Sequence, residues 1–144
     1  MQHNAKVFAP MIALGVAMSL VAGGFGLQIG KPSANPEAQA KNALLVVRGY
    51  ACGAPEKTTV SAIAEGLSMG KRESIALKLF PLSGESTYAL TRQWAAEGKW
   101  VITSVEANPR FQSQPRAIVT FDGNSVDWAG ITRLYEDLRH SAGG

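Results

Sequence analysis

Hydrophobic and polar positions divide the chain into one long apolar segment and a following region whose dominant period is two. The apolar segment runs from Val7 to Gly30 without a charged side chain, and Lys6 and Lys31 flank it. A spanning helix needs roughly 20 apolar residues to cross the hydrocarbon core of a bilayer. The pattern therefore predicts a membrane anchor or a signal peptide, in helical form, over residues 1–30.

The sequence leaves the processing of this segment open. A basic residue followed by an apolar run that ends near Ala22 is also typical of a signal peptide, with cleavage near Gly23. A second small-x-small site, Ala38-Gln39-Ala40, lies far beyond the apolar run. A buried core helix is the third interpretation, although uncharged segments of this length are uncommon in small soluble domains. An anchor and a cleaved signal both place the rest of the chain outside the cytoplasm, as a membrane-anchored or a secreted domain.

After the apolar segment, the chain divides into a linker and one domain. Pro32 and Pro36 stand among small and polar residues, which predicts a linker over residues 31–42. The remainder, residues 43–144, has the length of one ordinary domain with a single core.

Within residues 43–144 the pattern indicates β-structure. Six short apolar or alternating runs cover residues 43–47, 58–67, 74–80, 87–94, 99–105 and 116–121. The four residues Ala95-Ala96-Glu97-Gly98 separate the fourth and fifth runs, which predicts a hairpin between them. Turn signals at roughly ten-residue spacing favour a mainly β fold, an antiparallel sandwich, over a βαβ fold.

The end of the chain changes period and predicts a short amphipathic C-terminal helix over residues 127–140. The apolar residues at helical spacing are Trp128, Ile131, Leu134, Tyr135 and Leu138. Ser125 or Asp127 would cap the start of this helix. Its apolar face would dock on its own domain or on another protein. A seventh strand that begins at Val126 is the alternative.

The net charge and two single residues, Cys52 and His140, limit which kinds of binding or catalysis the chain could perform. The chain has a net charge of +3, and its basic residues are spread singly, which argues against a nucleic acid as partner. Cys52 is the sole cysteine, so it is buried and inert, forms an interchain disulfide, or binds a soft metal with Met69 as a weak second ligand. His140 is the domain's one histidine, and no catalytic or cofactor motif accompanies it, so we expect neither enzyme activity nor a cofactor.

Three tryptophans, Trp94, Trp100 and Trp128, have two interpretations. Exposed indole rings would bind sugars or other flat ligands, whereas buried rings would fill the core. Trp100 alternates in phase with Ile102, which favours a core position for at least one ring.

One stretch resembles a known family. The residues Thr87-Tyr88-Ala89-Leu90 and Trp94-Ala95-Ala96-Glu97-Gly98-Lys99-Trp100-Val101-Ile102 are similar to a strand, turn and Gly-x-Trp strand in YtkA-like and FixH-like extracytoplasmic domains. The resemblance implies an immunoglobulin-like β-sandwich behind an N-terminal membrane segment. FixH-like proteins are associated with the maturation of copper-containing oxidases, but no matching metal motif is present in this sequence.

Together these patterns predict an extracytoplasmic, immunoglobulin-like sandwich that acts by contact, as an accessory domain, a subunit or an assembly factor of a membrane complex. Its partners would be a protein and, through an uncleaved N-terminal segment, the membrane. Trp128, Tyr135 and the surroundings of Cys52 are the expected contact residues. The alternatives are a copper-handling accessory protein that uses Cys52 with Met69, and a small carbohydrate-binding module.

Overall fold

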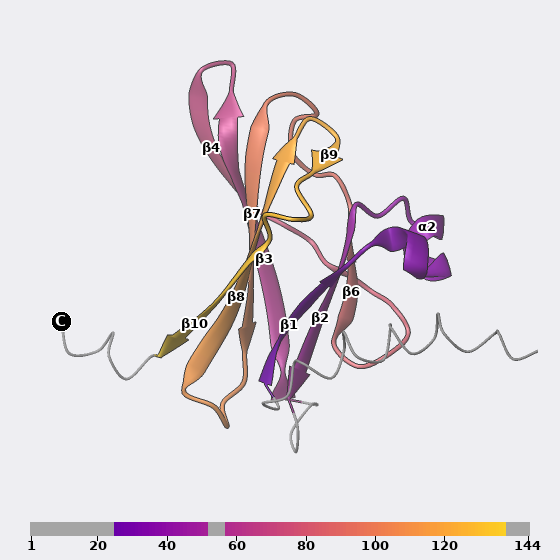
Figure 1. Ribbon diagram of the computed structural model, residues 1–144, viewed down its shortest axis with the longest axis vertical. Coiled ribbons are helices and arrows are strands. Elements are labelled where there is room, and N and C mark those ends of the chain that lie inside the picture. The colour runs from indigo at the N-terminus through magenta and orange to yellow at the C-terminus, as the bar shows by residue number, and fades with distance from the viewer. Residues whose placement is uncertain (1–24, 52–56, 138–144) are drawn as a thin grey trace, which may run out of the picture.

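The structure is a computed structural model that describes residues 25–51 and 57–137 (Figure 1). The strands are β1 (Phe25–Gly30), β2 (Leu45–Ala51), β3 (Thr59–Ser68), β4 (Lys71–Ala76), β5 (Phe80–Pro81), β6 (Thr87–Leu90), β7 (Lys99–Ala107), β8 (Ser113–Asp122), β9 (Ser125–Val126) and β10 (Thr132–Asp137). The helical segments are the 3₁₀ turn η2 (Pro32–Ala34) and the helix α2 (Pro36–Ala40). The prediction of a mainly β fold is confirmed.

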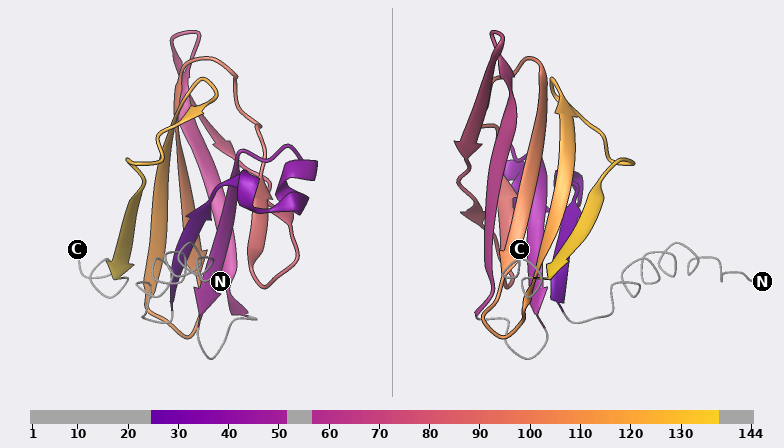
Figure 2. Two further views of the ribbon diagram at one scale, coloured as in Figure 1. Left: turned by 45° about the vertical axis from the view of Figure 1, so that its right-hand side comes forward. Right: turned by 90° about the vertical axis from the view of Figure 1, so that its left-hand side faces the viewer.

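The strands form two antiparallel sheets. The four-stranded sheet has the order β1-β2-β6-β5, and the six-stranded sheet has the order β10-β8-β7-β3-β4 with β9 paired to β8. Figure 2 shows the two sheets as separate layers, with β1 and β2 behind the six-stranded sheet in its right-hand view. The architecture is a two-layer arrangement of antiparallel sheets.

Alternation along the strands builds one interior between the sheets. In β7, Trp100 and Ile102 point inward and are almost fully buried, whereas Val101 between them is 38% exposed. They pack with Leu45 of β2 and Phe121 of β8, so both sheets contribute to the main core cluster. The prediction that at least one tryptophan ring fills the core is confirmed, because both Trp100 and Trp94 are buried there.

The predicted hairpin between residues 87–94 and 99–105 is wrong. β6 pairs with β2 and β5 in one sheet, whereas β7 pairs with β3 and β8 in the other. The chain between them crosses from sheet to sheet, and Trp94 enters the core on the way. The Arg92 guanidinium fixes this crossing by donating to the backbone oxygen of Gly123, at 2.9 Å, and to Oδ1 of Asn124, at 2.6 Å.

The predicted C-terminal helix over residues 127–140 is also wrong for the part that the structure describes. β10 pairs along the edge of β8, from Thr132 opposite Ile118 to Asp137 opposite Ser113. Without β10, the edge of β8 would present unpaired backbone groups, and strand pairing satisfies them. Asp127 accepts a hydrogen bond from the Gly130 amide, as a helix cap would, but this bond closes a turn. The alternative prediction, a seventh strand, was closer to the structure, although β10 begins at Thr132 and not at Val126.

The start of the domain differs from the predicted boundaries. Phe25–Gly30, assigned to the apolar segment, form β1 and pair with β2, and Leu27 is 2% exposed. The predicted linker contains α2, whose Ala38 is fully buried. Cleavage at residues 38–40 would remove β1 and this buried helix, so the fold favours the site near Gly23. The predicted N-terminal helix before Phe25 lies outside the described residues. Within the described ranges, no helix is long and apolar enough to cross a membrane.

Candidate functional site

No other described element packs over the outer face of the six-stranded sheet (Figure 2, right). One row of directly opposed residues crosses it, and the register gives that row as Ala76, Ile63, Thr103, Ile118 and Thr132. Directly opposed residues lie on the same face of an antiparallel sheet. The row therefore forms a β-branched and small stripe across five strands, without a charge.

The rows beside this stripe are nearly as poor in charge. One of them runs through Glu65, Val101 and Thr120, and the other runs through Ser61, Val105 and Arg116. Ile63 is 42% exposed and Val101 is 38% exposed. We call this surface the open sheet face, defined as Ser61, Ile63, Glu65, Val101, Thr103, Val105, Arg116, Ile118 and Thr120. It carries one acidic and one basic residue.

A second feature lies at the end of the sandwich where β1 begins. The ring of Phe25 stacks on Phe111, which belongs to the loop between β7 and β8, with ring centroids 4.4 Å apart and an interplanar angle of 11°. An open groove of about 580 Å³ adjoins this loop. Its lining residues are Lys57, Thr59, Ala107, Asn108, Pro109, Phe111, Gln112, Ser113 and Gln114. This end groove therefore offers amides, hydroxyls, one aromatic ring and one ammonium group.

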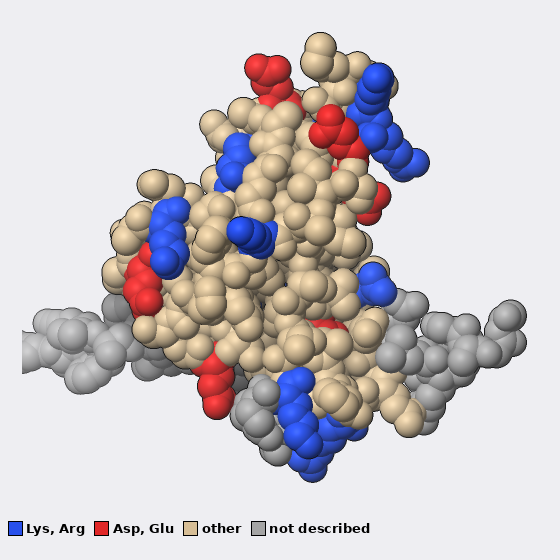
Figure 3. Space-filling model, turned by 180° about the vertical axis from the view of Figure 1, so that it is seen from behind, with Lys and Arg blue, Asp and Glu red and all other residues tan. Residues whose placement is uncertain are grey.

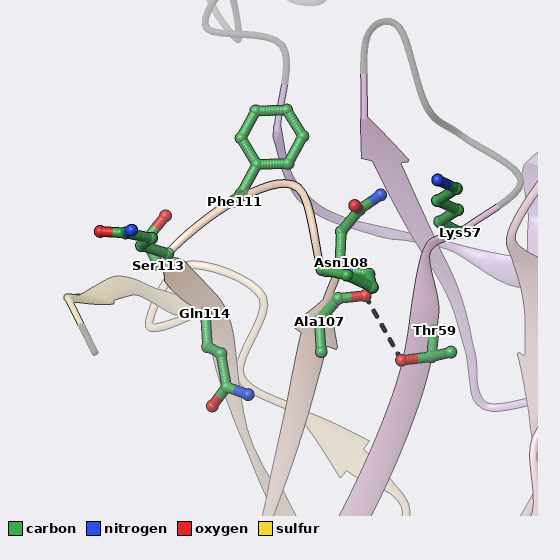
Figure 4. A pocket seen from close by; sticks show the side chains of 9 residues that line it. Lys57, Thr59, Ala107, Asn108, Phe111, Ser113 and Gln114 are labelled. Carbon is green, nitrogen blue, oxygen red and sulfur yellow. Dashed lines mark hydrogen bonds between the residues drawn. The ribbon is translucent and has the colours of Figure 1, made fainter. Parts of the chain in front are cut away.

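Figure 4 shows the ends of three strands, β3, β7 and β8, around the end groove. Thr59 of β3 donates from Oγ1 to the backbone oxygen of Ala107 in β7, at 3.3 Å, and Gln114 lies on the β8 side. Asn108 is 4% exposed and donates from Nδ2 to Oγ1 of Thr58, at 3.0 Å. These two hydrogen bonds hold polar side chains of the groove wall in place. Lys57 lies at the rim of the groove.

Glu106 is a buried carboxyl group between the sheets near the same end. It is fully buried, and neither carboxyl oxygen has a hydrogen bond of ordinary geometry. Burial raises the pKa of Glu106 to about 8, and the backbone amides of Tyr50 and Gly26 lower it by less. A Cβ atom at Gly49 would overlap this carboxyl, so glycine in β2 makes the space that Glu106 occupies. A pKa raised this far favours the protonated, neutral form of Glu106 at neutral pH.

The structure keeps Met69 apart from the chain that flanks Cys52. Cys52 lies outside the described residues, between Ala51 of β2 and Lys57 just before β3. Met69 is 99% exposed in the turn between β3 and β4, at the far end of β3 from Lys57. A ten-residue strand spans about 33 Å. No group of three or more His, Cys, Asp or Glu side chains in the described ranges could hold a metal ion.

The two aromatic residues predicted as contacts lie in different places. Trp128 is half-buried against the main core, and the Lys31 ammonium lies 5.4 Å from the centroid of its ring. Tyr135 belongs to β10, where its backbone pairs with Pro115. Trp128 therefore contributes mainly to packing, and Tyr135 pairs one register step from the groove residue Gln114.

Sequence reasoning missed the open sheet face and Glu106. The signal for Glu106 was present, because it continues the inward phase of Trp100, Ile102 and Ser104 along β7. The open sheet face needs strand order as well as alternation, and strand order is a long-range property. Outward residues of three separate runs have to be placed side by side before the face can be recognised.

Comparison with known proteins gives no relative. No family model matches the chain, and neither a curated protein nor a solved structure matches it. The description of the site therefore depends on the geometry of this chain.

Proposed function

We propose that this chain is an extracytoplasmic interaction domain, held at the membrane by its N-terminal segment, which binds a partner protein through the open sheet face. It would act as a subunit or assembly factor of a membrane complex, without an enzyme activity of its own. The observation that carries the proposal is the uncharged stripe from Ala76 to Thr132 across five strands.

The partner that fits this face is a protein with an uncharged surface of β-branched or aliphatic side chains. A polyanion would find one arginine there, Arg116, and one glutamate, Glu65, which lie in the two rows on opposite sides of the stripe. The nine residues lie on three strands over five positions each, so a strand spacing of about 4.8 Å and a rise of about 3.4 Å per residue give the face roughly 14 Å by 17 Å. This is smaller than the roughly 800 Å² per partner of specific complexes, so a partner would also contact the flanking strands β4 and β10.

The strand order supports the immunoglobulin-like part of the proposal. In that fold one sheet has strands A, B, E and D, and the other contains G, F and C. The order β1-β2-β6-β5 corresponds to A-B-E-D, and β8-β7-β3-β4 corresponds to G-F-C with a further strand C′. β10 would be an added edge strand. A YtkA-like or FixH-like relationship is compatible with this order and remains a proposal.

Membrane attachment is supported by the residues that remain before β1. Residues 7–24 are 18 uncharged residues, within the range of spanning helices. Lys6 precedes them, and a basic residue on the near side favours export of the chain that follows.

The two alternative functions gain no support from the described residues. A copper site shared by Cys52 and Met69 in one chain would need the two ends of β3 to meet. Sugar stacking on exposed tryptophans is disfavoured because Trp94 is 5% exposed and Trp100 is 1% exposed.

The proposal is tested by isolating the full chain from its own membranes in mild detergent. We expect one stoichiometric protein to co-purify with the wild-type chain and to be lost from Thr103→Lys, which places a charge in the centre of the open sheet face. Ala40→Lys, an exposed position on α2, is the control and should retain it. Equal retention by both variants, or a complex that consists of two copies of this chain, would contradict a separate partner on this face.

A further inference from the structure

We propose that the end of the sandwich around Phe25 and the β7–β8 loop rests on the bilayer, with Lys57 and Arg110 contacting the phosphates of anionic lipids and Phe111 entering the interface. This inference depends on the membrane attachment proposed above. It adds a lipid surface as a second, defined contact of the domain.

The first step is the absence of a spacer between the apolar segment and the fold. A helix of 18 residues, the length of segment 7–24, would be about 27 Å long at 1.5 Å per residue, whereas the hydrocarbon core is about 30 Å thick. A spanning helix would therefore use the whole segment. Phe25, the next residue, already belongs to β1 and pairs with Ala51. An anchored chain must consequently begin its first strand at the boundary of the hydrocarbon core.

The second step is what surrounds Phe25. The Phe111 ring stacks on it, so the β7–β8 loop lies at the same level as the end of the anchor. The headgroup layer adds roughly 5–7 Å on each side of the hydrocarbon core. A loop in contact with Phe25 would therefore lie within this layer. Phe111 keeps part of its surface exposed, as an aromatic side chain at an interface would.

The third step is charge. Lys57 and Arg110 are both exposed, and Arg110 directly precedes Phe111 in the chain. Figure 3 shows Lys and Arg side chains at this end and also at the opposite end of the molecule. The acidic residues that the strand register places at this end are Glu136 and Asp137, on the edge strand β10 opposite Gln114 and Ser113. Basic residues near an anionic membrane surface are attracted to it. The end groove adds amide donors beside Lys57 for phosphate oxygens.

This placement also orients the open sheet face. β3 runs from the membrane end to the turn at Met69, which would stand about 33 Å away from the lipid. The open sheet face would then rise beside the anchor, where a partner in the same membrane can reach it.

The test places a tryptophan at each end of the full-length chain. Phe111→Trp reports the membrane end, and Met69→Trp is the matched control at the far end. Each variant is reconstituted in vesicles of phosphatidylcholine and phosphatidylglycerol that contain a lipid with a shallow spin label. We expect the added emission of Phe111→Trp to be quenched and that of Met69→Trp to be unaffected, relative to the wild-type signal. Gln112→Trp, at an exposed position of the same loop, serves if Phe111→Trp fails to fold.

Charge dependence gives the second arm. In the Phe111→Trp background, Lys57→Gln with Arg110→Gln should reduce quenching in anionic vesicles, whereas Lys71→Gln with Arg72→Gln at the far turn should not. A chain that floats with vesicles while its loop tryptophan stays unquenched overturns this inference and leaves the attachment standing. A chain that does not float with vesicles overturns the proposed attachment and this inference together.

Discussion

The two sheets share one interior but differ on their outer faces. The four-stranded sheet is covered in part by the chain's own helix, because Ala38 of α2 packs with Ala89 and Leu82 in a small buried cluster (Figure 2, left). The six-stranded sheet has no such cover among the described residues, and Ile63 is 42% exposed on it. This difference is the basis of the proposal that the outer face of the six-stranded sheet is a contact surface.

The largest effect should come from a charge placed under the helix. Ala38→Lys puts an ammonium group at a fully buried site without a partner, and such burial costs several kcal/mol. We expect the free energy of unfolding in urea to fall by about 3 kcal/mol or more. Ala40→Lys on the exposed side of α2 should stay within about 0.5 kcal/mol of wild type. Similar losses in both variants would show that the helix does not cover the sheet.

The shared interior gives a pH-dependent effect. Glu106 has a pKa of about 8 in the fold against 4.5 in the unfolded chain, so the folded state holds the proton more tightly. Its contribution to stability is fully present below pH 4.5 and is lost as the pH rises towards 8, at about 1.4 kcal/mol per pH unit. Urea unfolding at several pH values should show this slope for wild type relative to Glu106→Gln. Parallel pH profiles would contradict a neutral, buried Glu106.

A smaller effect on stability is expected on the open sheet face. Ile63→Lys and Thr103→Lys place their charges where water already reaches, so each should change the free energy of unfolding by less than about 1 kcal/mol. The difference between these losses of unfolding free energy and the loss in Ala38→Lys measures how a covered site differs from the open sheet face. A loss as large as that of Ala38→Lys would mean that the described chain, or a second copy of it, covers this face too.

The smallest effect is expected at Met69. Met69→Ser should leave the free energy of unfolding within about 0.5 kcal/mol, because the side chain is almost fully exposed. It should also leave any copper binding of the monomeric chain unchanged, whereas Cys52→Ser would remove binding that the thiol supplies. Copper titration that shows an equal loss for both variants would restore the metal-handling alternative.

The local part of the fold could be predicted from the sequence, and the pairing could not. Alternation placed strands at 58–67 and 99–105 close to β3 and β7, because inward and outward positions differ in polarity along them. The sequence did not show that the chain changes sheets after Leu90, since that depends on Trp94 finding room in a core built by distant strands.

Two apolar segments were assigned to helices for the same physical reason. Phe25–Gly30 carry no charge, and an uncharged segment suits both a spanning helix and a buried edge strand. Composition therefore cannot distinguish the two structures. In β10, Leu134 and Tyr135 satisfy a helical spacing, but the free edge of β8 decides the outcome. The open sheet face was unpredictable because it joins residues from three runs, and Glu106 was predictable once the inward phase of β7 was extended by one step.

Site-specific photo-cross-linking in the chain's own membranes tests the central claim most directly. A photoreactive side chain replaces Thr103 on the open sheet face or, as the control, Arg48, an exposed outward position of β2 in the four-stranded sheet. The account predicts one discrete adduct with a second protein from Thr103 and none from Arg48. No adduct from Thr103, or the same adducts from both positions, would contradict the assignment of this face as the contact surface.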